Sequence, residues 1–189
     1  MIAGQIAMRA ATPDDATALA AIYGPYVVTN AVSFESSPPS VDNMRARIEA
    51  AGDTHPWIVA YDEESALVLG YALAKPFRPG AAYRFAVETA CYVAGEVEGQ
   101  GIRRLLYAAL IATLTAQNYT QAVSTLTLPQ DKAISLHEAI GFKRAGVYRE
   151  VSFKNGQWID VGVWQRDLSE PGTPPDELVG FGSVGVRRE

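Results

Sequence analysis

The chain has 189 residues, of which 48% are hydrophobic and 20% are charged, the balance of an ordinary globular protein. This length favours one domain, or one domain with a tail, and allows a core large enough to fold without disulfides. The net charge of −5 argues against bulk binding of nucleic acid, which is typically accompanied by a basic face. Because no apolar run has the length of a membrane span and the N-terminus lacks the pattern of a signal peptide, we expect a cytoplasmic protein that does not bind membranes.

The few thiol and imidazole groups narrow the possible chemistry. Cys91 is the single cysteine, so an intrachain disulfide is excluded, and its apolar neighbours at residues 89–93 predict a buried small side chain rather than a catalytic thiol. The two histidines, His55 and His137, are too few to make a structural zinc site with one cysteine. We expect no bound metal.

The first half of the chain alternates from one strand to two helices and then to three strands. Residues 5–9 predict a short strand. Thr12 and Pro13 predict a helix start, because threonine caps the first free N–H groups and proline suits the first helical position. Ser40 begins a second helix. The next elements are predicted to be a hairpin of strands over 57–61 and 67–74, a basic loop over 75–83 and a strand over 85–94.

The second half contains the clearest helix, over residues 102–117, whose leucines and alanines recur on one face. Asn155–Gly156 is a strong hairpin signal. The remaining elements are predicted to be a strand over 122–128, a helix over 132–140 that Gly141 ends, and strands over 148–153 and 158–165. Residues 169–189 are rich in proline and glycine and predict a loosely held tail. The order predicts an α/β fold, a mixed central sheet with helices on both faces.

One turn of the chain suggests anion binding. The segment from Glu98 to Arg103 carries Gly99 and Gly101 between a predicted strand and the long helix. Glycines allow a ligand to approach the backbone, and the helix start presents free N–H groups and a positive dipole end. Together these features suit a diphosphate, although an ordinary strand-to-helix connection is an equally common origin of such a turn. The segment is neither a Walker loop, since no Gly-Lys-Ser/Thr follows, nor a Rossmann fingerprint.

Four further stretches carry a resemblance to a known family. They are residues 74–79, 83–88 with 92–93, 136–142 and 153–162. With the glycine turn, these stretches resemble the GNAT acetyltransferase superfamily, and within it the phosphinothricin N-acetyltransferases, in order and spacing over roughly residues 6–168. The resemblance implies the GNAT acyl-CoA N-acyltransferase fold, one domain over 1–168 with a tail over 169–189, acetyl-CoA as co-substrate and a homodimer.

The chain departs from the family pattern at four positions. Glu98 stands where the family has Gln or Arg, and its carboxylate would repel a diphosphate. Arg103 replaces a Gly or Ala, so its side chain either crowds the turn or reaches the phosphates and restores the positive charge. Gln130 replaces an asparagine beside the coenzyme. Gly80 replaces an arginine of the substrate loop, which weakens a specific expectation of phosphinothricin as the acceptor.

The resemblance also assigns roles to residues of this chain. Glu88, within an apolar strand, matches the general base that removes a proton from the acceptor amine, and His137 matches a second catalytic or orienting residue. The coenzyme contacts it implies are Tyr92, Val93, Gly99, Gln100, Gly101, Ile102, Arg103, Arg104 and Gln130, those of 99–104 through main-chain amides. The substrate contacts are Phe34, Arg78, Tyr83, Tyr92 and Val161, with Arg78 suited to a carboxylate or phosphinate. Tyr107 and Trp164 are interpreted as packing.

Three functional hypotheses follow. The leading one is acetyl transfer to the α-amine of a small amino-acid-like acceptor of the phosphinothricin, methionine sulfone or methionine sulfoximine type. A second keeps the fold and coenzyme but changes the acceptor to a polyamine, an aminoglycoside or a protein N-terminus. The basic loop over 75–84 favours an acidic acceptor over a polycation. A third, motivated by Glu98 and Arg103, is a non-catalytic module that binds acyl-CoA.

Overall fold

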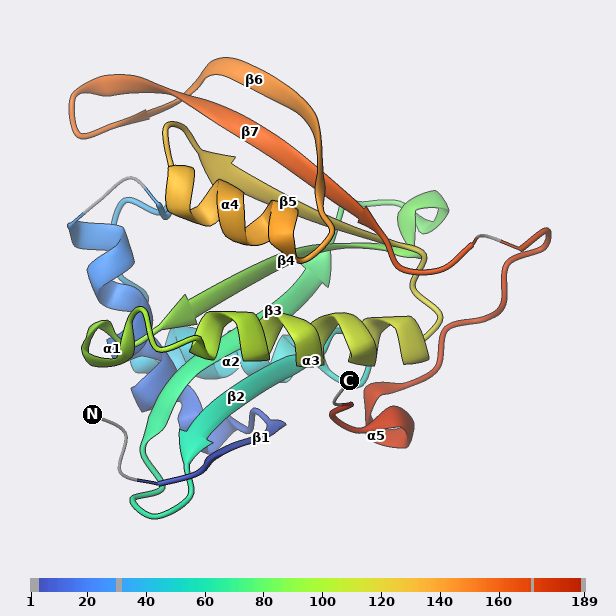
Figure 1. The fold of residues 1–189 in the computed structure, drawn as a ribbon, viewed down its shortest axis with the longest axis horizontal. Helices are drawn as coiled ribbons and strands as arrows, with labels where there is room; N and C mark the ends of the chain where they lie inside the picture. Colours follow the sequence, from blue (N-terminus) through green and yellow to red (C-terminus); the bar gives the residue numbers. More distant parts are fainter. Residues whose placement is uncertain (1–3, 30–31, 171, 188–189) are drawn as a thin grey trace.

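The computed structural model describes residues 4–29, 32–170 and 172–187, so the outer ends of the predicted domain and tail lie outside the described residues. Seven strands form one sheet in the order β1-β2-β3-β4-β5-β7-β6, in which only β4 and β5 run parallel among the described pairs (Figure 1). The strands are β1 (Ile6–Ala10), β2 (Trp57–Asp62), β3 (Val68–Pro76), β4 (Ala86–Val93), β5 (Gln121–Thr127), β6 (Lys143–Lys154) and β7 (Gln157–Asp167). The helices are α1 (Ala16–Val28), α2 (Val41–Ala51), α3 (Ile102–Ala116), α4 (Asp131–Ala139) and α5 (Phe181–Val184).

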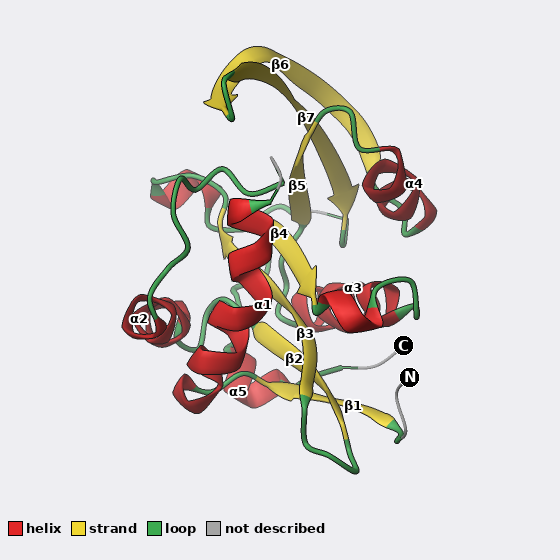
Figure 2. Ribbon diagram, turned by 90° about the vertical axis from the view of Figure 1, so that its left-hand side faces the viewer, coloured by secondary structure: helices red, strands yellow, loops and turns green. Residues whose placement is uncertain are grey.

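Helices cover both faces of the sheet, as the sequence predicts. In Figure 2, α1 and α2 lie on one side of the strands and α3 and α4 on the other. Leu19, Met44 and Trp57 belong to the core under α1 and α2, whereas Leu106 and Leu110 belong to the larger core under α3. The alternating burial of β4 supplies side chains to both cores, so this strand has functional side chains available on either face.

The predicted helix cap, hairpin turn and glycine turn are present in the structure. Ser40 caps α2 by accepting a hydrogen bond of 3.1 Å from the Asn43 N–H. Asn155 and Gly156 both have positive φ, at 52° and 78°, as a tight hairpin turn between β6 and β7 requires. Gly101 has φ 81° immediately before α3, a left-handed conformation that glycine adopts without steric cost.

The parallel pair at the centre of the sheet separates part-way along its length. β4 and β5 are paired from Ala86–Gln121 to Glu88–Val123, and both strands continue beyond that point. The Ala94 N–H donates to the Leu69 carbonyl, so the backbone groups of Ala94 point towards β3. Because the backbone groups of successive residues in a strand point to opposite edges, those of Cys91 and Val93 point away from β3, towards the gap between β4 and β5. The gap therefore exposes one edge of β4 inside the molecule.

The structure differs from the sequence-based expectations at β6 and in the tail. β6 begins at Lys143 rather than at 148, and all of its side chains are half-buried or exposed, as suits one of the two edge strands of the sheet. Its register also shifts twice, between Arg144 and Gly146 and between Tyr148 and Ser152, so no regular alternation of apolar residues marks it.

The tail is not loosely held over its described part. The Val179 N–H donates to the Gln117 carbonyl at 3.0 Å, and the Arg187 N–H donates to the Thr113 hydroxyl at 3.0 Å. Phe181 packs against the core beneath α3 together with Leu178 and Val186. These apolar residues are spaced too irregularly to indicate an element, but each finds apolar surface at the end of α3.

Candidate active site

Glu88 lies where β4 and β5 separate. Its Oε1 accepts a hydrogen bond of 2.9 Å from the Thr125 hydroxyl and lies 3.4 Å from the Lys75 ammonium. The side chain is 23% exposed, so the carboxylate is positioned by two partners and still reaches solvent. Lys75 lines a cavity on the α1–α2 face, and Thr125 lines a groove on the other side of β4. Glu88 therefore stands between two open spaces.

The groove lies between the separated ends of β4 and β5. The predicted residues Tyr92, Arg103, Gln130 and His137 all line it, together with Cys91. Cys91 is buried, and burial raises the pKa of its thiol to about 12, which agrees with the interpretation of an inert small side chain. The Gln130 amide donates to the Thr127 hydroxyl, which fixes its side chain at the start of α4.

His137 is buried at the base of the groove. Its Nδ1 lies 2.7 Å from the Ala133 carbonyl, which only accepts, so Nδ1 carries the proton. Burial lowers the pKa of His137, so the ring is neutral and its Nε2 is an acceptor. Nε2 lies 2.9 Å from the hydroxyls of both Tyr107 and Ser124. In this tautomer His137 holds two hydroxyl groups and has no Nε2 proton to donate.

The glycine turn presents free backbone donors at the start of α3. The N–H groups of Gly101, Ile102 and Arg103 have no acceptor among the described residues, as expected at a helix start. By contrast, the Gln100 N–H donates to Val97 at 3.3 Å and the Arg104 N–H to Gly101 at 3.0 Å, so these two amides are already used. The Ile102 side chain is buried in the core. The anion-binding part of the turn is thus narrower than the range 99–104.

Arg103 points into the groove rather than out over the turn. Its guanidinium donates to the Tyr26 hydroxyl at 3.1 Å and lies 3.8 Å from the exposed Glu98 carboxylate. The Tyr26 hydroxyl in turn donates to the Val93 carbonyl at 2.8 Å. Tyr26 and Arg103 therefore occupy the exposed edge of β4 at Val93, next to the free N–H groups of α3.

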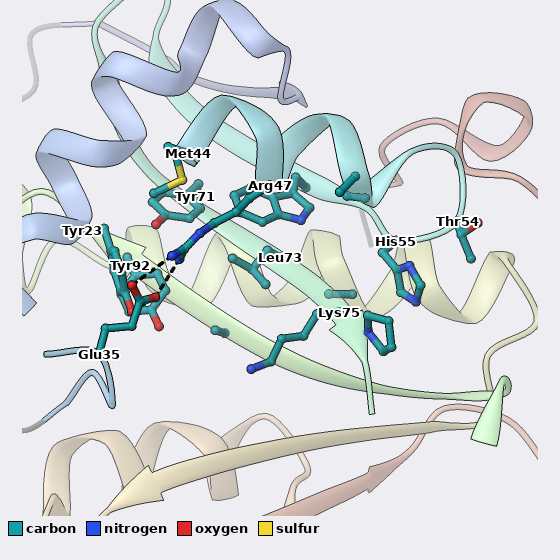
Figure 3. A pocket seen from close by; sticks show the side chains of 16 residues that line it. Tyr23, Glu35, Met44, Arg47, Thr54, His55, Tyr71, Leu73, Lys75 and Tyr92 are labelled. Atoms are coloured by element: carbon teal, nitrogen blue, oxygen red, sulfur yellow. Dashed lines mark hydrogen bonds and ion pairs between the residues drawn. The ribbon is translucent and has the colours of Figure 1, made fainter. Parts of the chain in front are cut away.

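A larger cavity of about 560 Å³ lies on the opposite face of β4, enclosed by α2 and by β2 and β3 (Figure 3). Figure 3 shows Glu35 and Arg47 together at one end, His55 and Thr54 at the other and Lys75 between them. Trp57 and Tyr71 stack in its wall with ring centroids 5.8 Å apart. Its size is typical of pockets that bind small molecules.

An ion pair closes one end of this cavity. Arg47 donates two hydrogen bonds to the Glu35 carboxylate, at 2.6 and 2.9 Å, and lowers the pKa of Glu35. The Tyr23 hydroxyl donates to the same carboxylate at 3.0 Å. These bonds fasten the loop around Glu35 to both α1 and α2, so the loop forms a fixed wall of the cavity.

The other predicted substrate residues lie outside the cavity lining. Phe34 is exposed, and Tyr83 is exposed with its ring edge-on to Phe77. The Arg78 guanidinium donates to the Tyr148 hydroxyl at 3.3 Å, and Val161 is buried opposite Tyr148 on β7. Arg78 and Val161 therefore belong to a second group of side chains between the basic loop and the β6–β7 hairpin.

Sequence reasoning missed several residues of the site, and the reasons differ. Tyr107 has the spacing of a core residue, and only the position of His137 reveals that its hydroxyl is used. Glu35 and Arg47 are separated by a loop, and no sequence pattern couples them. Lys75 is opposite Glu88 in the β3–β4 register, a pairing that an exact hairpin alignment would have identified.

The described residues contain neither a metal-binding cluster nor a helix that could span a membrane. Within residues 4–29, 32–170 and 172–187, no group of three or more His, Cys, Asp or Glu side chains is arranged to hold a metal ion. No helix in these ranges is both long and apolar enough to cross a membrane.

Comparison with known proteins identifies the family. Residues 8–163 match the family model described as acetyltransferase (GNAT) domain. The chain is 40% identical over 164 residues to phosphinothricin N-acetyltransferase of Alcaligenes faecalis, covering 86% of this chain and 82% of the relative. It is 30% identical over 169 residues to the L-methionine sulfoximine/L-methionine sulfone acetyltransferase of Pseudomonas aeruginosa, covering 89% and 98%.

A solved structure agrees with these relatives. The GNAT superfamily phosphinothricin acetyltransferase from Sinorhizobium meliloti, in complex with AcCoA, is 34% identical and superposes with a TM-score of 0.86 over 91% of this chain and 94% of that one. The fold expected from the sequence is thereby confirmed. The chain belongs to the GNAT acetyltransferase family and is an N-acetyltransferase related to the phosphinothricin N-acetyltransferases.

Proposed function

We propose that the protein transfers the acetyl group of acetyl-CoA to the α-amine of a small amino-acid-like acceptor of the phosphinothricin, methionine sulfone or methionine sulfoximine type. One observation carries the proposal: a single Glu88 oxygen contacts Lys75 of the cavity and Thr125 of the groove. A base at this position reaches an amine that enters from the cavity and a thioester that enters from the groove. The names of the relatives support this acceptor class.

The groove and the turn suit the coenzyme. The free N–H groups of Gly101, Ile102 and Arg103 would hold its diphosphate, and the backbone edge of β4 at Cys91 would hydrogen-bond its amide-bearing arm. The backbone groups of Val93 are bonded to the Tyr26 hydroxyl and become available to the arm only if Tyr26 moves. The coenzyme supplies an acetyl thioester, whose thiolate is a good leaving group. In this arrangement the Arg103 guanidinium turns from Tyr26 towards the phosphates, where it offsets the charge of Glu98.

The residues of this chain divide the chemistry between them. Glu88 removes a proton from the acceptor ammonium, directly or through a water, and the neutral nitrogen attacks the thioester carbonyl. The Cys91 N–H faces the gap and would stabilise the negative charge that develops on the carbonyl oxygen. The new C–N bond forms as the C–S bond breaks, the attacking nitrogen loses its second proton, and the thiolate takes that proton to leave as the free thiol. His137 acts as a positioning residue that holds the Tyr107 hydroxyl beside the groove.

The arrangement of the whole molecule is part of the proposal. Residues 1–168 form the catalytic domain, to which the tail over 169–189 is attached, and the enzyme acts without a metal as a cytoplasmic homodimer. Exposed aromatic residues on the β6–β7 hairpin support a dimer: Tyr148, Phe153 and Trp158 are 49%, 61% and 63% exposed.

The test is release of free thiol from acetyl-CoA by the purified protein, with phosphinothricin, methionine sulfone, methionine sulfoximine, a polyamine and no amine. We expect release with the amino-acid analogues and not with the polyamine or the blank. Release with the polyamine alone would favour the acceptor class of the second hypothesis. Binding of acetyl-CoA without release in any reaction would indicate the non-catalytic module.

A further inference from the structure

The walls of the cavity beside Glu88 are mostly apolar and aromatic. Trp57 lines the cavity, and Figure 3 shows the rings of Tyr71 and Tyr92 and the side chains of Met44 and Leu73 around the same space. The small side chains of Ala50 and Ala51 of α2 also belong to the lining. Pockets of this composition gain affinity mainly from the apolar surface that a ligand buries in them.

The charged groups of the lining are already paired. Arg47 is bound at both terminal nitrogens by Glu35 and through Nε by Asn43 at 2.8 Å, so it has little capacity left for a ligand anion. Among the described residues that line the cavity, Lys75 is the cation that no carboxylate binds through both oxygens. Its side chain is 54% exposed at the mouth of the cavity, beside Glu88. The cavity can therefore neutralise one ligand carboxylate at its mouth, but a second anion placed deeper would be buried unpaired.

Two polar side chains of the lining, Tyr71 and His55, make no side-chain hydrogen bond among the described residues. Tyr71 is 1% exposed, lines the cavity, and its hydroxyl makes no hydrogen bond within the described residues. Burial raises its pKa, so it remains a neutral donor. Burial lowers the pKa of His55, so its ring is neutral and adds an N–H rather than a cation. The interior thus accepts a neutral side chain and can satisfy a hydrogen-bond acceptor on it at either residue.

Resting on the proposed acetyl transfer, we propose that the preferred acceptors are neutral α-amino acids with a bulky apolar side chain, aromatic ones above all, and that phosphinothricin is a poorer acceptor. The α-carboxylate lies at Lys75 and the α-amine at Glu88. The side chain extends between α2 and the sheet towards Trp57. Arg78, which would neutralise a phosphinate, lies outside this cavity and is bonded to Tyr148.

The experiment compares kcat/KM for L-phenylalanine, L-alanine and phosphinothricin in the thiol-release assay. We expect kcat/KM for phenylalanine to exceed that for alanine about 10- to 100-fold, the factor for burying a side chain of this size. We expect kcat/KM for phosphinothricin to be at least about tenfold lower than that for phenylalanine. Lys75 is occupied by the α-carboxylate, so the interior of the cavity offers no cation to neutralise the phosphinate. Equal or higher kcat/KM for phosphinothricin would overturn the inference while leaving the proposed function intact.

A pair of variants locates the side-chain site. Ala51→Leu fills the cavity and should lower kcat/KM for phenylalanine at least about tenfold with little change for alanine, since one methylene in an apolar pocket is worth about 10- to 200-fold. Ala46→Leu adds the same group to an exposed position of α2 outside the lining and should change neither value. An unchanged phenylalanine rate in Ala51→Leu would place the side chain elsewhere.

A binding measurement separates this inference from acetyl transfer itself. Trp57 lies in the cavity wall, so L-phenylalanine should change the tryptophan fluorescence of the wild-type protein saturably. The Kd for phenylalanine obtained from this change should be at least about tenfold higher in Ala51→Leu. Saturable binding without thiol release would refute the proposed function and keep the site. No binding and no release with phenylalanine, while alanine or methionine sulfone is acetylated, would refute the site alone.

Discussion

Glu88→Gln tests the role of the carboxylate between the cavity and the groove. The amide oxygen of glutamine can still accept the hydrogen bond from Thr125, so the side chain should keep its place. The ability to take a proton is lost, and removing a positioned general base lowers turnover about 10²- to 10⁴-fold. We therefore expect kcat in the thiol-release assay to fall by that factor, with the Kd for acetyl-CoA changed less than about twofold.

The same substitution should have little effect on folding. Lys75 and the Glu88 carboxylate are both partly exposed, and ion pairs of this kind contribute only about 0–1 kcal/mol. Turnover of the variant should also rise with pH, since a larger share of the acceptor amine has already lost its proton at higher pH without help from a base. Glu49→Gln makes the same chemical change on an exposed position of α2 and is the matched control. An unchanged kcat, or a large loss of acetyl-CoA affinity, would refute the assignment of Glu88 as base.

Three further predictions follow from the groove and the tail. Arg103→Gly should raise the Kd for acetyl-CoA about 10- to 100-fold by calorimetry, the value of one charge-assisted contact; tighter binding would show that the side chain obstructs the groove. Burial lowers the pKa of His137 below its reference of 6.5, so the unfolded chain binds that proton first. The free energy of unfolding should therefore fall as pH drops through and below 6.5, and denaturant titrations should show a shallower fall in His137→Asn. Phe181→Ala should lower stability by about 1–3 kcal/mol in the same titrations, whereas a loosely held tail would show no change.

The sequence predicted well those features that depend on neighbouring residues. The cap at Ser40, the turn at Asn155–Gly156 and the left-handed Gly101 each depend on a few adjacent side chains, and the structure has all three. The buried face of α3 followed from its period in the same way. The order of these elements predicted a mixed sheet with helices on both faces, and the resemblance to the family identified it as the GNAT fold.

Features that depend on contacts between distant residues were predicted poorly. The carboxylate of Glu35 and the guanidinium of Arg47 meet only because the intervening loop folds back onto α2, and no periodicity records that. The sequence left open whether Arg103 crowds the turn or reaches the phosphates, and its contact with the Tyr26 hydroxyl in the groove could not be read from it. The edge strand β6 has no buried face along much of its length, so the pattern that identifies a strand is absent from it.

The early separation of β4 from β5 has a consequence for how much of the enzyme a cell keeps. A ligand that pairs with the open edge of β4 serves as a substitute strand, and the folded state gains its binding free energy. At a hundredfold excess over Kd this gain is about 2.7 kcal/mol, enough to reduce the unfolded fraction available to proteases about 100-fold. The lifetime of the protein would then depend on the supply of the coenzyme on which it acts.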